Sequence, residues 1–373
     1  MNQKKYTHYY FLLLTVSFLL IMLFNLLLRS YHSNRPLMIV LKKPSSLIIG
    51  TSTTNFGINP DHNSIANQNF YNISVGGIKN KLLWIKKIDS INKLDNIILG
   101  LDFFEYNYFR KEKVDEEINY IDNKILIIKK LLKELLSIDS LLYSLKKLFG
   151  FANEVILNNG YASQNDFTLI TSFQEMPLHE LKAFLPLPNK EFSIYGDDIL
   201  SSKLHYLKKI IIYCADQKIN LIMILPPRHI SLTKMERYLG INTSLDQWKS
   251  EIAELVMDTK QYYHESLKFQ LWDFALVNDI STENLPDDGK NMKWFRDRIH
   301  FKEAYGNMIL DMVFNNKDIS FFPENFGKRI DNYNIEEHLI NNNYHYEINN
   351  KKLITLFDRI ETNIDHSVDL YKN

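Results

Sequence analysis

The stretch Ser46-Leu47-Ile48-Ile49-Gly50-Thr51-Ser52 decides the fold class of this chain. It is a short apolar run closed by small polar residues, which predicts a buried strand ending at a Gly-Thr-Ser turn. The pattern returns at Phe70 to Val75, closed by Gly76-Gly77, and at Asn96 to Leu101, with helical spacing from Asn80 to Ile91 between them. This alternation predicts an α/β fold, a parallel sheet with helices on both faces.

The alternation continues through a domain that we expect to cover residues 45–315. From Val114 to Phe149, apolar residues recur at helical spacing, which favours a long amphipathic helix packed on the sheet over a partner-binding or membrane-surface helix. Residues 151–197 carry three prolines and are interpreted as an irregular insertion, with a lid over the active edge as one role. The remaining expected elements are helices at 199–217, 245–264 and 302–314 and strands at 220–225 and 269–272.

The C-terminal part, residues 316–373, is Asn-rich and is expected to be an accessory segment without catalytic residues. A hairpin is expected there, with strands at Tyr344 to Ile348 and Leu353 to Phe357 around Asn349-Asn350.

A second feature stands at the N-terminus, where Tyr9 to Leu28 holds twenty residues without a formal charge. Such a helix spans about 30 Å, one bilayer core. The run ends in Arg29 rather than in a cleavage site with small residues, so a retained single-pass anchor is predicted. Residues 1–8 would then be cytoplasmic and residues 29–44 a linker. The flanking charges do not decide the orientation.

Composition excludes several classes of protein. Lys+Arg and Asp+Glu both total 44, so there is no basic field and no nucleic-acid partner is expected. Cys214 is the one cysteine, which rules out an intrachain disulfide. The sequence has no glycine-rich phosphate loop, no cysteine cluster and no H-E-x-x-H motif, and its eleven histidines are scattered. Neither a cofactor nor a metal is predicted.

Polar residues at the ends of the predicted strands are candidates for chemistry. Ser52 follows the first strand and Gly77 follows the second, while Asp297 and His300 lie three apart on a later loop. A serine hydroxyl needs a base within hydrogen-bond reach and a third group that orients the base. We therefore expect Ser52 as nucleophile, His300 as base and Asp297 as its orienting carboxylate.

Four motifs resemble those of the SGNH (GDSL-like) hydrolases and acyltransferases over roughly residues 45 to 315. The first block, a strand and a Gly-x-Ser turn, is matched by Leu47 to Ser52, and the second, Asn-x-x-x-x-Gly, by Asn72 to Gly77. The third, Gly-x-Asn-Asp, is similar to Gly100-Leu101-Asp102-Phe103, and the last, Asp-x-x-His, is Asp297 to His300. The resemblance implies a flavodoxin-like three-layer fold.

The resemblance also implies an oxyanion hole formed by the Ser52 N–H, the Gly77 N–H and the side chain at Asp102. Here the chain departs from the family, because an ionised aspartate repels an oxyanion where the family's asparagine donates to it. Asp102 is protonated, is replaced by another donor such as Asn80 or Asn107, or has another role. Thr51 also stands where the family has an aspartate before the serine.

An anchor joined to such a domain resembles envelope proteins of the alginate O-acetyltransferase and teichoic-acid D-alanyl-transfer types. This implies an O-acyltransferase or esterase acting on cell-envelope polysaccharide, a multispanning membrane protein as acyl donor and a domain on the periplasmic side. The alternative is an inactive SGNH-fold binding or assembly protein. In the turn Pro226-Pro227-Arg228-His229, a solvated loop is favoured over a role in substrate contact.

Overall fold

The computed structural model describes residues 3–28, 34–137, 142, 144–146, 149, 154–164, 178–185, 187, 190–196, 202–263, 268–285, 291–330, 335–352, 358, 361–362, 364–365, 367–369 and 371. The chain divides into two compact units, which are described separately. The first comprises Met1–Lys43 and Glu116–Asn165, and the second Pro44–Asp115 and Asp166–Asn373.

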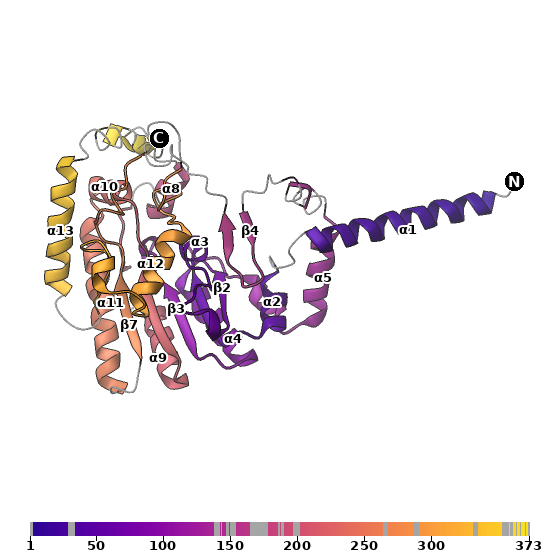
Figure 1. The fold of residues 1–373 in the computed structure, drawn as a ribbon, viewed down its shortest axis with the longest axis horizontal. Coiled ribbons are helices and arrows are strands. Elements are labelled where there is room, and N and C mark those ends of the chain that lie inside the picture. The colour runs from indigo at the N-terminus through magenta and orange to yellow at the C-terminus, as the bar shows by residue number, and fades with distance from the viewer. Residues whose placement is uncertain are drawn as a thin grey trace. The chain divides into compact units, whose positions relative to one another are not determined.

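The second unit is built on a mostly parallel sheet flanked by helices (Figure 1). Its strand order is β2-β1-β3-β6-β7-β8. Each neighbouring pair in the series β2-β1-β3-β6-β7 is parallel, and β8 pairs antiparallel with β7. The predicted α/β class is thus confirmed as a mixed, mostly parallel sheet flanked by helices. The strands are β1 Ser46–Gly50, β2 Phe70–Ser74, β3 Asn96–Gly100, β6 Asn220–Leu225, β7 Phe269–Asp273 and β8 Lys328–Arg329.

Helices connect these strands, as parallel pairing requires. In the second unit they are α3 Ser52–Gly57, α4 Ile78–Ile91, α8 Leu178–Phe184, α9 Leu204–Gln217, α10 Ile230–Tyr238, α11 Asn242–Tyr263, α12 Glu303–Val313 and α13 Ile335–Lys352. The first unit contains α1 Gln3–Leu28, α2 Arg35–Lys42, α5 Lys124–Leu135 and the antiparallel strands β4 Glu154–Ile156 and β5 Ala162–Gln164.

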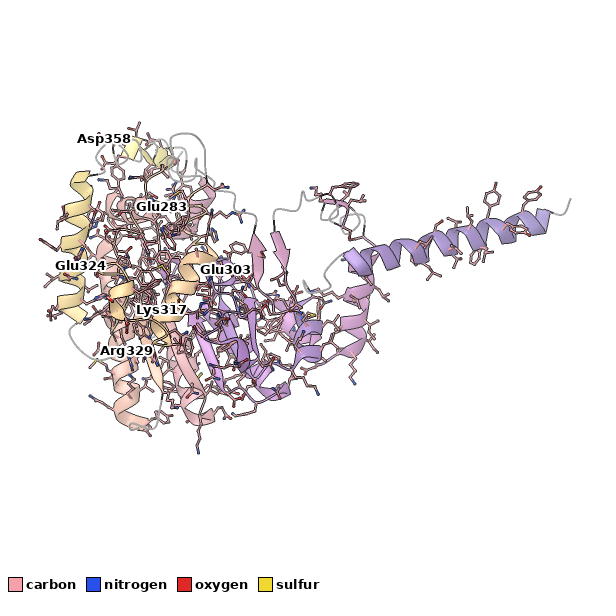
Figure 2. The ribbon with its side chains drawn as sticks, in the orientation of Figure 1. Glu283, Glu303, Lys317, Glu324, Arg329 and Asp358 are labelled. Atoms are coloured by element: carbon pink, nitrogen blue, oxygen red, sulfur yellow. The ribbon has the colours of Figure 1, made fainter. Side chains whose placement is uncertain are left out.

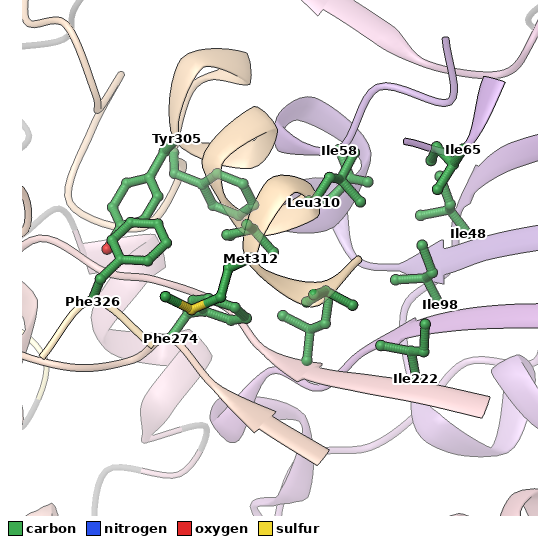
Figure 3. Packing of buried hydrophobic residues seen from close by; sticks show 14 of the residues in the cluster. Ile48, Ile58, Ile65, Ile98, Ile222, Phe274, Tyr305, Leu310, Met312 and Phe326 are labelled. Atoms are coloured by element: carbon green, nitrogen blue, oxygen red, sulfur yellow. The ribbon is translucent and has the colours of Figure 1, made fainter. Parts of the chain in front are cut away.

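One face of the sheet packs against α12. Ile48, Ile98 and Ile222 lie side by side in register on β1, β3 and β6. They belong to a buried cluster that also contains Tyr305 and Leu310 of α12 (Figure 3). Burial of each such aliphatic side chain stabilises the fold by roughly 1.5–3 kcal/mol.

The alternate residues of the same strands, which point to the opposite face, are buried as well. Leu47, Ile97 and Leu221 form one such row, and each is fully buried. Helix α9 contacts β6, α11 contacts β7, and α9 also packs on α4 and α11. Both faces of the parallel part of the sheet are therefore covered by helices.

Several expected elements differ from the structure. The continuous helix expected from Val114 is wrong, because a 3₁₀ helix at Glu116–Tyr120 precedes α5. The side chain of Asn123 accepts hydrogen bonds from the Ile125 and Leu126 N–H groups, so the helix begins there. Helix α5 also falls in the first unit, whereas the sheet lies in the second. The expected linker contains α2, capped by Asn34.

The C-terminal hairpin is also wrong in its first strand, since Tyr344 to Ile348 lie within α13. Residues 353–357 lie outside the described residues. The expected irregular insertion contains β4, β5 and α8, and residues 165–177 within it lie outside the described part of the chain.

The N-terminal segment forms α1. Among the residues that the structure describes, no helix has both the length and the apolarity needed to cross a membrane. The anchor at Tyr9 to Leu28 is therefore unconfirmed and stays a prediction.

Candidate active site

The turn that carries Ser52 is fixed by a cap and by a close helix contact. Thr51 caps α3, because its Oγ1 accepts from the Thr53 N–H at 3.2 Å. Helix α3 then approaches α12 so closely that a Cβ at Gly306 would lie 1.7 Å from the Gly57 carbonyl oxygen. Because α12 follows His300 directly in the chain, this contact fixes the serine turn relative to the histidine.

The loop from Trp294 to Lys302 holds Asp297 and His300. It closes through an antiparallel bridge between Phe295 and Phe301 and through the bonds Arg296 N–H to His300 O (3.0 Å) and Lys302 N–H to Trp294 O (2.8 Å). Glu283, labelled in Figure 2, accepts from the Lys293 and Trp294 N–H groups and so holds the base of the loop. Glu303, also labelled there, accepts from Asn59 and holds the start of α12.

The structure brings Ser52, His300 and Asp297 together in the order of a catalytic triad. Ser52 Oγ lies 2.8 Å from His300 Nε2, and His300 Nδ1 lies 2.8 Å and 2.9 Å from the two Asp297 oxygens. The expected geometry is present, although the chain separates Ser52 from His300 by 248 residues. A hydroxyl at this distance can pass its proton to the imidazole.

Electrostatics favour an ionised Asp297. Burial by itself raises the pKa of this carboxyl, but His300 and the N–H groups of Ile299 and His300 outweigh burial and hold the pKa below its usual range. Asp297 Oδ1 accepts from those two N–H groups at 2.9 Å and 2.7 Å. The carboxylate is therefore positioned before any substrate arrives, as an orienting group must be.

A pocket of about 540 Å³ opens beside the nucleophile. Its lining comes from the ends of β1 and β2 and from the segment after β3 and comprises Thr51, Ser52, Ser74, Gly76, Gly77, Phe104, Glu105, Arg110, Lys111, Glu112 and Lys113. Such a volume is ordinary for a small-molecule site. The carboxyl ends of these parallel strands lie at the same edge of the sheet, and the cavity opens there.

The Gly77 N–H, expected as an oxyanion donor, is already bonded. It donates to Glu105 Oε1 at 2.6 Å. Glu105 Oε2 in turn forms a buried ion pair with Lys81 Nζ at 2.5 Å, and Lys81 also donates to Gly100 O at 3.0 Å. Burial raises the pKa of Glu105, and Lys81 opposes that shift.

Asp102 also has a partner other than an oxyanion. Its Oδ2 accepts from Thr51 Oγ1 at 2.7 Å. The two positions at which the chain departs from the SGNH pattern are thus bonded to each other. Asp102 thereby orients the residue that caps α3, so its role here includes support of the serine turn.

Neither Asn107 nor Asn80, the expected replacement donors, lines the pocket. Asn107 Nδ2 donates to Phe184 O at 2.6 Å, and Asn80 Nδ2 donates to the carbonyl oxygens of Gly76 and Lys113. Both side-chain amides therefore donate to backbone carbonyl oxygens and not into the pocket. The structure offers no substitute for the family's asparagine at either position.

The turn at Arg228-His229 is buried, so the interpretation as a solvated loop is wrong. Arg228 Nη1 pairs with Glu236 at 2.5 Å, and His229 is fully buried. His229 caps α10 by accepting the Ser231 N–H at Nδ1, and its Nε2 lies 2.9 Å from Glu283 O. This network assigns the proton to Nε2. Burial lowers the pKa of His229 to about 4.

Acid is therefore expected to destabilise the fold through His229. In the unfolded chain a histidine titrates near 6.5, so this contribution to stability is full above that pH and is lost as the pH falls toward 4. Between pH 8 and pH 5 the expected loss is about 2 kcal/mol. Replacing His229 by asparagine preserves a capping oxygen. Urea unfolding at both pH values should show about 2 kcal/mol less pH dependence in His229→Asn, and equal dependence in both proteins would contradict the assignment.

In the part of the chain that the structure describes, no group of three or more His, Cys, Asp or Glu side chains could hold a metal ion.

Comparison with known proteins returns no matching family model, no matching curated protein and no matching solved structure. The roles proposed below therefore depend on geometry and motif resemblance.

Sequence reasoning missed Lys81 and Glu105. The signal for Lys81 was available, because it falls on the buried stripe Ile78, Lys81, Leu82, Ile85, Ile88 of α4. A lysine on an apolar stripe requires a buried partner. Glu105, inside the apolar run Phe103 to Tyr106, carries the same signal. Only the tertiary structure shows that Lys81 pairs with Glu105 and that Glu105 accepts from the Gly77 N–H.

Proposed function

We propose that this chain is a membrane-anchored serine acyl-transfer enzyme of SGNH type, an O-acyltransferase or esterase that acts on cell-envelope polysaccharide. The observation that carries the proposal is the continuous hydrogen-bond chain from Ser52 through His300 to Asp297. The four motifs in SGNH order and the adjoining pocket support the same conclusion.

In this proposal Ser52 Oγ attacks the carbonyl carbon of an ester while its proton moves to His300 Nε2. The C–O bond of the ester breaks, and the leaving alcohol takes that proton. The acyl-enzyme is then attacked by a hydroxyl of the acceptor, whose proton passes to His300 and returns to Ser52. Water in place of the acceptor makes the protein an esterase. Asp297 holds the imidazole in the required tautomer and stabilises its protonated form.

A second function, a binding or assembly protein without turnover, is favoured by a different observation. The Gly77 N–H is engaged by Glu105, and Asp102 presents a carboxylate where the family has a donor amide. One missing donor typically costs about 10²–10³ in rate. A protein that lacks both oxyanion donors would acylate its serine slowly and could still bind a ligand in the pocket.

Labelling with a serine-reactive fluorophosphonate distinguishes the two functions. We expect the full-length protein to be labelled and Ser52→Ala to remain unlabelled. Ser90→Ala, which removes an exposed serine at the distal end of α4, serves as the control and should label like the parent. Absence of label on every protein would reject catalysis. Analysis of surface polysaccharide from cells with and without Ser52→Ala then tests transfer, and unchanged acylation would reject the transferase.

The membrane location belongs to the same proposal. Helix α1 exposes apolar side chains at consecutive positions, among them Phe11 at 75% and Leu14 at 69%. Side chains of this kind are stable in a lipid environment. The labelled protein should thus sediment with membranes and be cleaved by protease added outside the cytoplasmic membrane, if the domain is periplasmic. A multispanning acyl donor would be its partner there.

A further inference from the structure

Two backbone N–H groups near Ser52 could donate to an oxyanion, and they differ in whether they already have a hydrogen-bond partner. The Ser52 N–H, at the start of α3, has no hydrogen-bond partner within the described part of the chain. The Gly77 N–H, which lines the same pocket, donates to the Glu105 carboxylate at 2.6 Å. An oxyanion and this carboxylate are both anions, and both would accept from the same N–H.

Glu105 is held at Gly77 from two sides. Its second carboxyl oxygen bonds Lys81, which is itself anchored to Gly100 O, and both side chains are at most 2% exposed. Its backbone carbonyl accepts from Lys203 Nζ at 3.0 Å, and Lys203 also donates to Arg110 O at 2.7 Å. A buried and doubly held carboxylate does not leave the N–H without cost.

We propose that Glu105 is a positioning residue that limits the rate of Ser52 acylation, because its carboxylate occupies the Gly77 N–H that would otherwise stabilise the oxyanion. The inference rests on the proposed serine chemistry. In the resting protein the oxyanion can use the Ser52 N–H, and it gains the Gly77 N–H only when Glu105 is displaced. The carboxylate therefore opposes acylation by competing for a donor.

The experiment compares two neutral replacements of the buried ion pair in the full-length protein. Lys81→Met with Glu105→Met removes both charges and frees the Gly77 N–H. Lys81→Met with Glu105→Gln removes the same charges but keeps an oxygen that can accept from Gly77. Replacing both partners of a buried pair is often neutral for stability, whereas removing one is not. The readout is the second-order rate of Ser52-dependent fluorophosphonate labelling.

We expect the methionine pair to react about 10²-fold faster than the parent, in line with one restored donor. The glutamine pair should show less than about a tenth of that gain, because the N–H stays engaged. A purely structural role for Glu105 would not raise the rate. Equal gains in both variants would assign the effect to charge alone and overturn the inference.

A milder variant keeps the inference testable if the methionine pair does not fold. Glu105→Asp shortens the side chain by one methylene, so its carboxylate cannot reach both Lys81 and Gly77, and labelling should accelerate. A folded protein with Ser52-dependent label but no acceleration would overturn the role of Glu105 and leave the proposed function standing. Absence of Ser52-dependent label in all variants would reject the proposed function, and this inference with it.

Discussion

Replacing Asp297 by asparagine is expected to lower the rate of Ser52 labelling by about 10⁴ while the fold is kept. The asparagine oxygen can still accept from the Ile299 and His300 N–H groups that bond Asp297 Oδ1, so the loop keeps its shape. Its NH₂ group, however, would face His300 Nδ1. The histidine would then carry its proton on Nε2 and could not accept the proton of Ser52.

A second aspartate–histidine pair provides the control for this variant. Asp311 lies 3.6 Å from His62 Nε2, outside the pocket. Asp311→Asn makes the same chemical change there and should leave the labelling rate within about 2-fold of the parent. If Asp297→Asn slowed labelling by less than about 10-fold with unchanged circular dichroism, a base other than His300 would have to be found.

The largest effect on stability is expected from Lys249→Met, at about 3–5 kcal/mol. Lys249 Nζ lies 2.6 Å from Asp273 Oδ2 at the end of β7, and His338 of α13 lies 2.9 Å from the same oxygen. Asp273 is fully buried. Loss of the lysine leaves the buried Asp273 carboxylate with His338 and the Ala275 N–H as partners but without its strongest cation, so the unfolding free energy should fall sharply.

The sign of the accompanying pH dependence follows from the same contacts. Burial raises the pKa of Asp273, but Lys249 and His338 outweigh it and hold the pKa well below its usual range. A lowered carboxyl pKa contributes stability that is full above the unfolded value, near 4, and is lost as the pH falls below it. In Lys249→Met the unfolding free energy should fall less on acidification, because the folded state without Lys249 stabilises the Asp273 carboxylate less.

Denaturant unfolding at pH 7 measures both effects. Lys208→Met, at an exposed position of α9, is the matched control and should change stability by less than about 0.5 kcal/mol. Adding Asp273→Asn to Lys249→Met removes the stranded charge while the amide oxygen can still accept from the Ala275 N–H. The double variant should recover most of the unfolding free energy that Lys249→Met loses. A single variant as stable as the control would show that the ion pair is dispensable.

The strands β1, β3 and β6 were predictable because they are short apolar runs bounded by turn residues, a signal contained within each segment. Helices α10 and α13 were not. Helix α10 follows a Pro-Pro pair and is capped by a histidine whose orientation depends on Glu283, 54 residues away. Helix α13 lacks a regular apolar stripe, and a buried contact that holds it, from His338 to Asp273, depends on a distant strand.

The sequence by itself indicated where five of the strands lie along the chain and singled out Ser52, Asp297 and His300 as candidate residues, because strand ends and motif spacing are local properties. The tertiary structure decided that these three side chains meet, since Gly57 and Gly306 allow α3 and α12 to approach. It also decided that Gly77 donates to Glu105 and that Asp102 accepts from Thr51. A hydrogen-bond partner depends on which groups packing brings within 3 Å, and a linear motif carries no such distance.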